Sequence, residues 1–330
     1  MMATSTNRLK RKTSAIKSTQ IELLNRKIQT FSESSTPKNT ERAYISDLDC
    51  FLEWGGKLPS TPIGVAQYLA AHAHVHRVGT LRRRKSMISK WHRKEKLEDP
   101  TTDLVVKETM AGISRLYNAP VRKKKPLSIN QLNKIVRHLE SVIGDNYVGS
   151  THRRKALRDR AMITVGFWGC LRSDELVSLK VKDLQLTQHS LKVFNAHTKT
   201  DKANLGRQKT LKSLPQLCPV EAVRAYLAEE APKNNLFPSL TPKGELGTEA
   251  IKSKSILDWL VRLCSNAKVR KTNIGSHSLR RGFATWYAES GDIWGLMAAG
   301  DWKNAEVASG YVESSLDIKM IRKRLKQRIR

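Results

Sequence analysis

Residues 162–176 read MITVGFWGCLRSDEL, an apolar run followed directly by charged residues, and the fold of the chain is predicted outward from this stretch. The apolar run predicts a buried helix over residues 159–169, followed by a second helix over 173–180. Arg172 stands directly after the buried run, where a plain core would not place a charge. Glu175 follows one helical turn later, close enough to hold the guanidinium. A surface ion pair is the structural alternative, so this pair alone does not establish a site.

A second polar pair lies further along the chain, where residues 276–280 read SHSLR. We expect a helix capped by Ser276 to begin here. His277 and Arg280 are three residues apart and so share a face of that helix. Two cations near a helix N-terminus favour a bound anion. Taken singly, this pair also has a structural alternative, a capped helix start.

Two further stretches contain reactive side chains. Residues 299–304 read AGDWKN, and Tyr311 follows Trp302 by nine residues. Residues 197–200 read HTKT, within a strand-rich region that we expect over residues 182–212. Among seven tyrosines, Tyr311 is the one that follows the tryptophan and precedes a polar stretch. The others fall at apolar helical positions or at the ends of elements, which favours structural roles.

Together these four stretches resemble the catalytic boxes of the tyrosine recombinases, the phage integrase family. In chain order they resemble the first arginine box at residues 169–176, the β-hairpin lysine motif at 197–200, the H-x-x-R box at 277–280, and the final box from 299 to Tyr311. Trp302, at a position where the family has His or Trp, resembles the Cre-type recombinases in particular. The order and spacing of all four boxes agree, and the resemblance covers about residues 36–330 because the helical N-terminal domain also resembles the DNA-clamping domain of the family.

The resemblance implies that Tyr311 attacks a DNA phosphate and forms a 3′-phosphotyrosyl link. A phenol has a pKa near 10, so it needs neighbouring cations to act as a nucleophile at neutral pH. The implied roles are charge neutralisation on the phosphate by Arg172 and Arg280, proton donation to the leaving 5′ oxygen by Lys199, a hydrogen bond to the phosphate from Trp302, general base or phosphate ligand for His277, and orientation of Arg172 by Glu175.

The composition agrees with a polyanionic substrate. The chain has 60 Lys and Arg residues against 30 Asp and Glu, a formal net charge of +30. A field of this strength favours nucleic acid as a partner. We expect no metal and no nucleotide cofactor, because the chain has neither a P-loop pattern nor a carboxylate cluster typical of two-metal nucleases. No apolar run approaches the ~20 residues of a membrane-spanning helix, so we expect no membrane partner.

The patterns divide the chain into four parts. Residues 1–20 read as a disordered basic arm. Residues 21–119 predict a helical DNA-binding domain, with helices expected over 21–31, 36–54, 62–74, 80–96 and 104–117. The basic, proline-containing residues 120–127 read as a linker. Residues 128–330 form the expected catalytic domain, which opens on a capping box between Ser128 and Gln131.

The expected fold class is mainly α. An N-terminal helical core-binding (SAM-like) domain is followed by an α-rich catalytic domain with one small antiparallel β-sheet at residues 182–212 and helices from there to the end. The resemblance implies that the two domains form a C-shaped clamp on duplex DNA. It also implies that an amphipathic helix over residues 316–330 docks on a neighbouring protomer and builds a homotetramer on two DNA duplexes.

Basic residues interleaved with apolar ones over 80–96 predict a helix that turns one face to the core and another to the DNA major groove. A solvated surface is the structural alternative. The expected DNA contacts are Thr40, Arg42, Arg82, Arg83, Lys85, Ser86, Ser89, Lys90 and Arg93, with Lys252 and Lys254 in the second domain.

The sequence therefore predicts a site-specific recombinase that exchanges strands at a specific DNA site through a Holliday junction. Two alternatives stay open: a type IB-like topoisomerase, and a catalytically idle sequence-specific DNA-binding protein. The expected location is the cytoplasm of a bacterial host, or the nucleus of a eukaryotic one.

Overall fold

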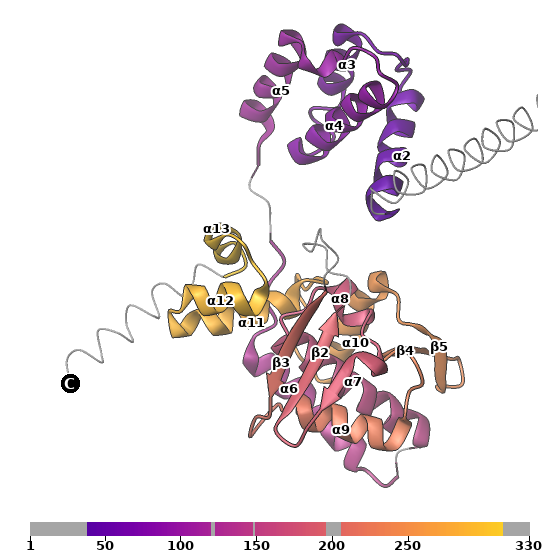
Figure 1. The fold of residues 1–330 in the computed structure, drawn as a ribbon, viewed down its shortest axis with the longest axis vertical. Helices are drawn as coiled ribbons and strands as arrows, with labels where there is room; N and C mark the ends of the chain where they lie inside the picture. Colours follow the sequence, from indigo (N-terminus) through magenta and orange to yellow (C-terminus); the bar gives the residue numbers. More distant parts are fainter. Residues whose placement is uncertain (1–37, 120–122, 148, 196–205, 313–330) are drawn as a thin grey trace, which may run out of the picture. The chain divides into compact units, whose positions relative to one another are not determined.

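The computed structural model describes residues 38–119, 123–147, 149–195 and 206–312. The chain divides into two compact units, Met1–Val121 and Arg122–Arg330 (Figure 1). The predicted arm at residues 1–20, the predicted helices at 21–31 and 316–330, and part of the predicted linker lie outside the described residues.

Four α-helices make up the described part of the first unit. They are α2 (Lys38–Glu53), α3 (Pro62–Ala71), α4 (Val78–Lys94) and α5 (Leu104–Tyr117), with a 3-10 turn, η1 (Pro100–Thr102), before the last. Side chains set two of the starts, because Thr61 caps α3 and Asp103 caps α5. The core forms around Tyr68, Leu69 and Leu81, whose side chains are fully buried.

The four predicted helices that fall on described residues match α2, α3, α4 and α5 in order, while the helix predicted over 21–31 lies outside them. The helix expected over 104–117 coincides with α5, while α3 ends before residue 74 and α4 begins before residue 80. His72 marks the end of α3, because its backbone leaves helical geometry there.

The second unit begins with α6 (Ile129–Gly144) and α7 (Ser150–Trp168), which are packed together in Figure 1. The predicted capping box is confirmed: Gln131 N donates to Ser128 Oγ at 3.3 Å, and Ser128 N donates to Gln131 Oε1 at 2.9 Å. After the short helix α8 (Ser173–Val177) and the turn η2 (Val181–Asp183) come three strands, β1 (Leu184–Leu186), β2 (Ser190–Asn195) and β3 (Arg207–Lys212).

These strands form an antiparallel sheet in the order β1-β2-β3. The β2–β3 register pairs Asn195 with Arg207 and Leu191 with Leu211, so the two strands face each other along their full length. Leu191, Val193 and Leu211 are buried and join the main core of the unit. The predicted mainly helical class with a small antiparallel sheet is confirmed.

The region after this sheet differs from the prediction of helices alone. Between α9 (Pro219–Glu230) and α10 (Ile256–Asn266) lies a second, two-stranded antiparallel ribbon of β4 (Pro238–Leu240) and β5 (Leu246–Ala250). Gly244 has a positive φ of 79° in the turn between them, a conformation that glycine adopts without strain. The turn η3 (Ser253–Ser255) leads from the ribbon into α10.

The chain then forms three helices that lie together in yellow tones in Figure 1: α11 (Ser278–Tyr287), α12 (Ile293–Gly300) and α13 (Ala305–Ser309), with the turn η4 (Ala288–Ser290) after α11. Gly282 allows α11 to approach the start of α6, because a Cβ there would lie 2.0 Å from the Leu127 carbonyl oxygen. Hydrogen bonds from Arg280 to the Cys170 carbonyl and from Ser173 to the Ser276 carbonyl join this region to the segment that carries Arg172.

Candidate active site

Arg172 and Glu175 form an ion pair at the start of α8. Arg172 occupies the N-cap position, where the chain is extended, and its Nη1 lies 2.5 Å from Glu175 Oε1. The second carboxylate oxygen of Glu175 accepts a hydrogen bond from the Arg172 backbone N–H at 2.8 Å. Glu175 is only 3% exposed. The carboxylate therefore fixes both the backbone and the side chain of Arg172.

His277 and Arg280 stand at the start of α11, but Ser276 does not cap this helix as predicted. The helix begins at Ser278, so His277 is the N-cap residue, and its exposed ring makes no capping hydrogen bond. The hydroxyl of Ser278 accepts instead from the Gly275 N–H at 2.9 Å. Ser276 precedes the cap, and its carbonyl accepts from the Ser173 hydroxyl at 3.1 Å.

Arg280 is the largest fully buried side chain of the described residues. Its Nη1 donates to the Cys170 carbonyl at 2.5 Å, and its Nη2 donates to the Gly300 carbonyl. The guanidinium carbon lies 4.3 Å from the Trp302 ring centroid and 5.4 Å from that of Tyr311. Arg280 thus joins the segment before Arg172 to the two aromatic residues of the final box.

Tyr311 is half-buried, and its ring lies beside that of Trp302. Its ring centroid lies 5.0 Å from that of Trp302 and 6.4 Å from that of His277. The Gly310 carbonyl next to it accepts hydrogen bonds from Lys123 Nζ at 2.9 Å and from Arg281 Nη1 at 3.1 Å. The sequence analysis missed these two residues; the only signals were the basic run at 122–125 and a second arginine after Arg280.

Segment 123–128 runs along the loop that precedes α11. Lys125 N donates to the Asn273 carbonyl and Leu127 N donates to the Ser278 carbonyl, both at 2.9 Å. In return, the Ser278 hydroxyl donates to the Lys125 carbonyl at 2.6 Å, and Asn273 Nδ2 donates to the Lys123 carbonyl at 3.2 Å. These hydrogen bonds fix the turn from which His277 projects.

The structure therefore gathers six of the seven predicted catalytic side chains in one region. Cys170 bonded to Arg280, and Ser173 bonded to Ser276, hold the Arg172 segment against the start of α11. The remaining residue, Lys199, lies outside the described residues, between β2 and β3. A phenol, two guanidiniums, an imidazole and an indole N–H in one cluster are suited to bind a phosphate and attack it.

Two buried donors of this cluster have no partner among the described residues: Arg280 Nε and Trp302 Nε1. A buried N–H without an acceptor costs about 1–3 kcal/mol. An oxygen-rich anion entering the cluster would offset this cost. Within the described residues, no group of three or more His, Cys, Asp or Glu side chains is placed to hold a metal ion.

The predicted DNA-contacting residues of the first unit differ in exposure. Arg42, Arg82, Arg83, Ser86 and Arg93 are exposed, whereas Thr40, Lys85 and Lys90 are half-buried. Ser89 is 9% exposed and donates to Asp99 Oδ2 at 2.5 Å, so the outward orientation predicted for it is wrong. It is buried on α4 together with Ile88 and His92, and the charge pattern did not separate it from the basic face.

Several of the exposed cations already have partners within the unit. Arg83 donates to both carboxylate oxygens of Asp47, at 2.6 and 2.8 Å. Arg82 donates to the Ser114 hydroxyl at 3.1 Å. Lys90 lies 4.2 Å from the centroid of the Tyr44 ring. In the second unit, the predicted residues Lys252 and Lys254 are exposed beside η3.

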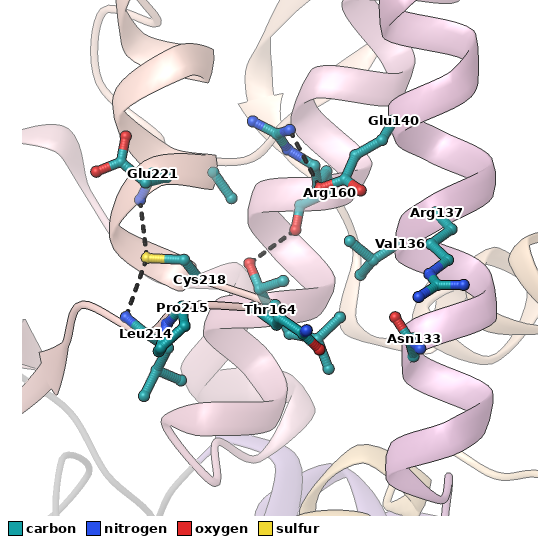
Figure 2. Close-up of a pocket in the computed structure, with 13 residues that line it drawn as sticks. Asn133, Val136, Arg137, Glu140, Arg160, Thr164, Leu214, Pro215, Cys218 and Glu221 are labelled. Carbon is teal, nitrogen blue, oxygen red and sulfur yellow. Dashed lines mark hydrogen bonds and ion pairs between the residues drawn. The ribbon is translucent and has the colours of Figure 1, made fainter.

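A separate cavity of about 360 Å³ lies between α6, α7 and the segment that enters α9 (Figure 2). It contains none of the predicted catalytic residues. Cys218 caps α9 on its wall, and its sulfur accepts from the Leu214 and Glu221 N–H groups at 3.4 Å each. Burial alone would raise the pKa of this thiol, but these hydrogen bonds lower the pKa below its ordinary value.

None of the described helices combines the length and the apolar composition that a bilayer crossing requires.

Comparison with known proteins gives a consistent result. Residues 149–317, which are 169 of the 330 residues, match the model of the phage integrase family. An integrase/recombinase XerD homolog of Selenomonas ruminantium is 28% identical over 293 residues, which cover 85% of this chain and 83% of that protein.

Solved structures show the same fold at lower identity. A lambda integrase dimer bound to a COC′ core site is 14% identical with a TM-score of 0.60, covering 88% of this chain and 76% of that one. The Tn1549 transposon integrase in complex with a circular intermediate DNA gives 14% and 0.58, covering 89% and 96%. The XerH recombinase bound to a palindromic difH substrate is 18% identical with a TM-score of 0.53. The match covers 77% of this chain and 66% of the XerH chain.

Proposed function

Because this chain belongs to the phage integrase family of tyrosine recombinases, we propose that it cuts and rejoins duplex DNA at a specific site, with Tyr311 as the nucleophile. One observation supports this proposal above the others. The Tyr311 ring lies beside Trp302, Arg280 and His277, in a cluster where two buried N–H donors have no acceptor among the described residues.

In the proposed reaction, the Tyr311 oxygen attacks a DNA phosphorus, and a P–O bond to tyrosine forms as the bond to the 5′ oxygen breaks. The phenol proton passes to a base, and the distance of 6.4 Å between the ring centroids of His277 and Tyr311 supports His277 in this role. Negative charge develops on the nonbridging oxygens, where cationic and N–H groups stabilise it. Lys199 supplies the proton to the departing 5′ oxygen.

The positions of the two arginines suit different parts of this task. Arg172, held by Glu175, is the more exposed of the two and presents its forked guanidinium to the phosphate. Arg280 is enclosed, and two of its N–H groups are used by carbonyls. It therefore contributes a fixed positive charge and one nitrogen without a partner among the described residues, Nε, in a region of low dielectric, where a charge acts more strongly.

The phosphotyrosyl link preserves the energy of the phosphodiester, so a 5′-hydroxyl from a partner strand can reverse the step without ATP. Lambda integrase has been captured as a tetramer bound to a Holliday junction. We extend this to the present chain: four copies on two duplexes exchange strands through such a junction, and residues 316–330 join neighbouring protomers. The first unit and the exposed lysines Lys252 and Lys254 contact the DNA.

A covalent-trapping experiment tests the proposal. The protein is incubated with fragmented DNA of its native replicon, without metal or ATP, and SDS-resistant adducts are recovered and sequenced. We expect an adduct with the wild type and none with Tyr311→Phe. Tyr287→Phe is the matched control, because Tyr287 packs on Phe283 of the same helix and should leave the adduct intact.

Each outcome has a defined meaning. Tight DNA binding by the wild type without an adduct would exclude the cleavage reaction and leave a binding protein. An adduct that persists in Tyr311→Phe would show that the nucleophile is another residue. Relaxation of supercoiled DNA without joining of two sites would assign the protein to the topoisomerase reaction instead.

A further inference from the structure

A half-buried ion-pair cluster connects β3 to the turn between α12 and Trp302. Arg207 Nη1 lies 2.9 Å from Asp301 Oδ1, and Lys209 Nζ lies 3.0 Å from Asp301 Oδ2. Arg207 and Lys209 are two apart on one strand, so their side chains point to the same face of the sheet. Asp301 and Lys209 are each only 14% exposed. Their interaction is therefore less screened by solvent than a surface ion pair.

The backbone at Asp301 is also unusual. Asp301 ends α12 in the left-handed region, with φ 53° and ψ 42°. Asp is among the few residues other than glycine that adopt this conformation readily. Lys209 Nζ also donates to the Ala299 carbonyl at 2.7 Å, so the strand holds the helix end by both its backbone and the carboxylate.

The same turn holds the buried arginine of the active site from its other side. The Gly300 carbonyl accepts from Arg280 Nη2, and the Trp302 ring covers the Arg280 guanidinium at 4.3 Å. Residues 299–302 thus alternate in what they contact. Ala299 and Asp301 bind β3, while Gly300 and Trp302 hold Arg280.

We propose that Asp301 is a positioning residue for the reaction at Tyr311: its ion pairs with Arg207 and Lys209 fix the turn that sets Trp302 and the Gly300 carbonyl on Arg280. This inference rests on the proposed function. Asp301 touches neither the phosphate nor the nucleophile in this arrangement, and it acts through the residues on either side of it. Binding its carboxylate to β3 also keeps a negative charge from competing for Arg280.

The test measures the rate of covalent complex formation on the duplex recovered by the trapping experiment, in parallel with DNA affinity and thermal stability. Asp301→Asn keeps the size and the left-handed backbone preference but removes the charge. We expect cleavage to slow by about tenfold to a hundredfold, because small errors in the position of catalytic groups have effects of this size. DNA affinity should stay unchanged.

Further variants test Lys209, which binds Asp301, and Trp302, through which Asp301 acts. Lys209→Met should slow cleavage in the same way, and the double variant with Asp301→Asn should be no slower than the slower single variant, as expected for one shared contact. Lys209→Arg keeps the charge and should retain most of the rate. In a Trp302→Phe background, Asp301→Asn should have a smaller effect than in the wild type, because its influence passes through Trp302.

Asp292→Asn is the matched control. Asp292 is exposed and caps the opposite end of the same helix, where it accepts from the Gly295 N–H at 2.8 Å. It should lower stability without changing the cleavage rate. The inference fails if Asp301→Asn cleaves at the wild-type rate, or if Asp292→Asn slows cleavage as much as it does. Absence of an adduct with the wild type would instead overturn the proposed function.

Discussion

Replacing Asp159 by Asn should destabilise the second unit far more than a similar change on the surface. Asp159 is 1% exposed on α7. Its carboxylate accepts hydrogen bonds from Arg158 at 2.9 Å, Trp259 at 3.0 Å and Arg262 at 3.2 Å. Asn keeps the shape but removes the charge and one acceptor. The guanidinium of Arg158, 4% exposed, then stays buried without a counter-ion.

Breaking a buried pair in this way costs about 3–5 kcal/mol, because the remaining charge cannot return to water. For a domain of this size, each kcal/mol lowers the melting temperature by roughly 2–4 °C. The expected loss is therefore about 6–20 °C. Part of the Arg158 charge is compensated by the Pro238 carbonyl, which accepts from its Nη1 at 2.9 Å. The lower half of the range is accordingly the better expectation.

Thermal unfolding followed by circular dichroism measures this loss, and Glu229→Gln provides the control. Glu229 binds Arg153 through both carboxylate oxygens, at 2.9 and 2.7 Å, but both side chains are more than a third exposed. An exposed pair of this kind contributes about 0–1 kcal/mol. If Asp159→Asn melts within 2 °C of Glu229→Gln, at about the size of a surface effect, burial does not govern the energy of this cluster.

Three further results are expected. Gly300→Ala should slow DNA cleavage more than it lowers the melting temperature, because the new Cβ would lie 1.9–2.5 Å from atoms of the Trp302 ring and displace it; an unchanged rate would contradict this packing. Iodoacetamide at neutral pH should label Cys218 before Cys170, because the pKa of Cys218 is lowered whereas burial raises the pKa of Cys170 to about 11. Peptide mass mapping measures this order, and the reverse order would contradict the lowered pKa of Cys218. Burial alone would raise the pKa of Asp301, but its ion pairs hold the pKa below the ordinary 3.8. The ion pairs therefore contribute their whole stabilisation above pH 3.8, and this stabilisation is lost as the pH falls through the pKa that Asp301 has in the folded protein. The difference in unfolding free energy between wild type and Asp301→Asn should shrink over that acidic range, and a difference independent of pH would exclude the ion pairs as its source.

The helices of the first unit were accessible from sequence because local signals define them. The Asp103 cap and the apolar spacing that follows fix α5 at its predicted limits. The start of α7 could not be predicted from the sequence in the same way. Its first turns carry the basic run HRRK at 152–155 and the pair Arg158 and Asp159, which look like a solvated surface. The pair is buried because the two charges neutralise each other and because Trp259, Arg262 and the Pro238 carbonyl bind them inside the fold.

The residues of the candidate site likewise differ in whether local sequence or tertiary contacts define them. Arg172, Glu175, His277 and Arg280 occur at short spacings within single segments, so the sequence alone indicates them. Asp301 did not stand out, since its partners lie on β3 and only the strand register brings them to it. The β4–β5 ribbon was missed because its strands are short, although the turn sequence at 242–244, PKG, is typical of a tight reversal.

Segment 123–128 has a mechanical consequence. The first unit ends at residue 121, and the chain that follows is joined by hydrogen bonds to the loop before α11 through Lys125 and Leu127. Any tension between the two units must therefore be carried by these bonds before it reaches the body of the second unit. The load falls on the turn that carries His277 and, through Lys123, on the carbonyl beside Tyr311. The chain is thus anchored next to His277 and Tyr311, and a pull on it would reach these two residues before the rest of the second unit.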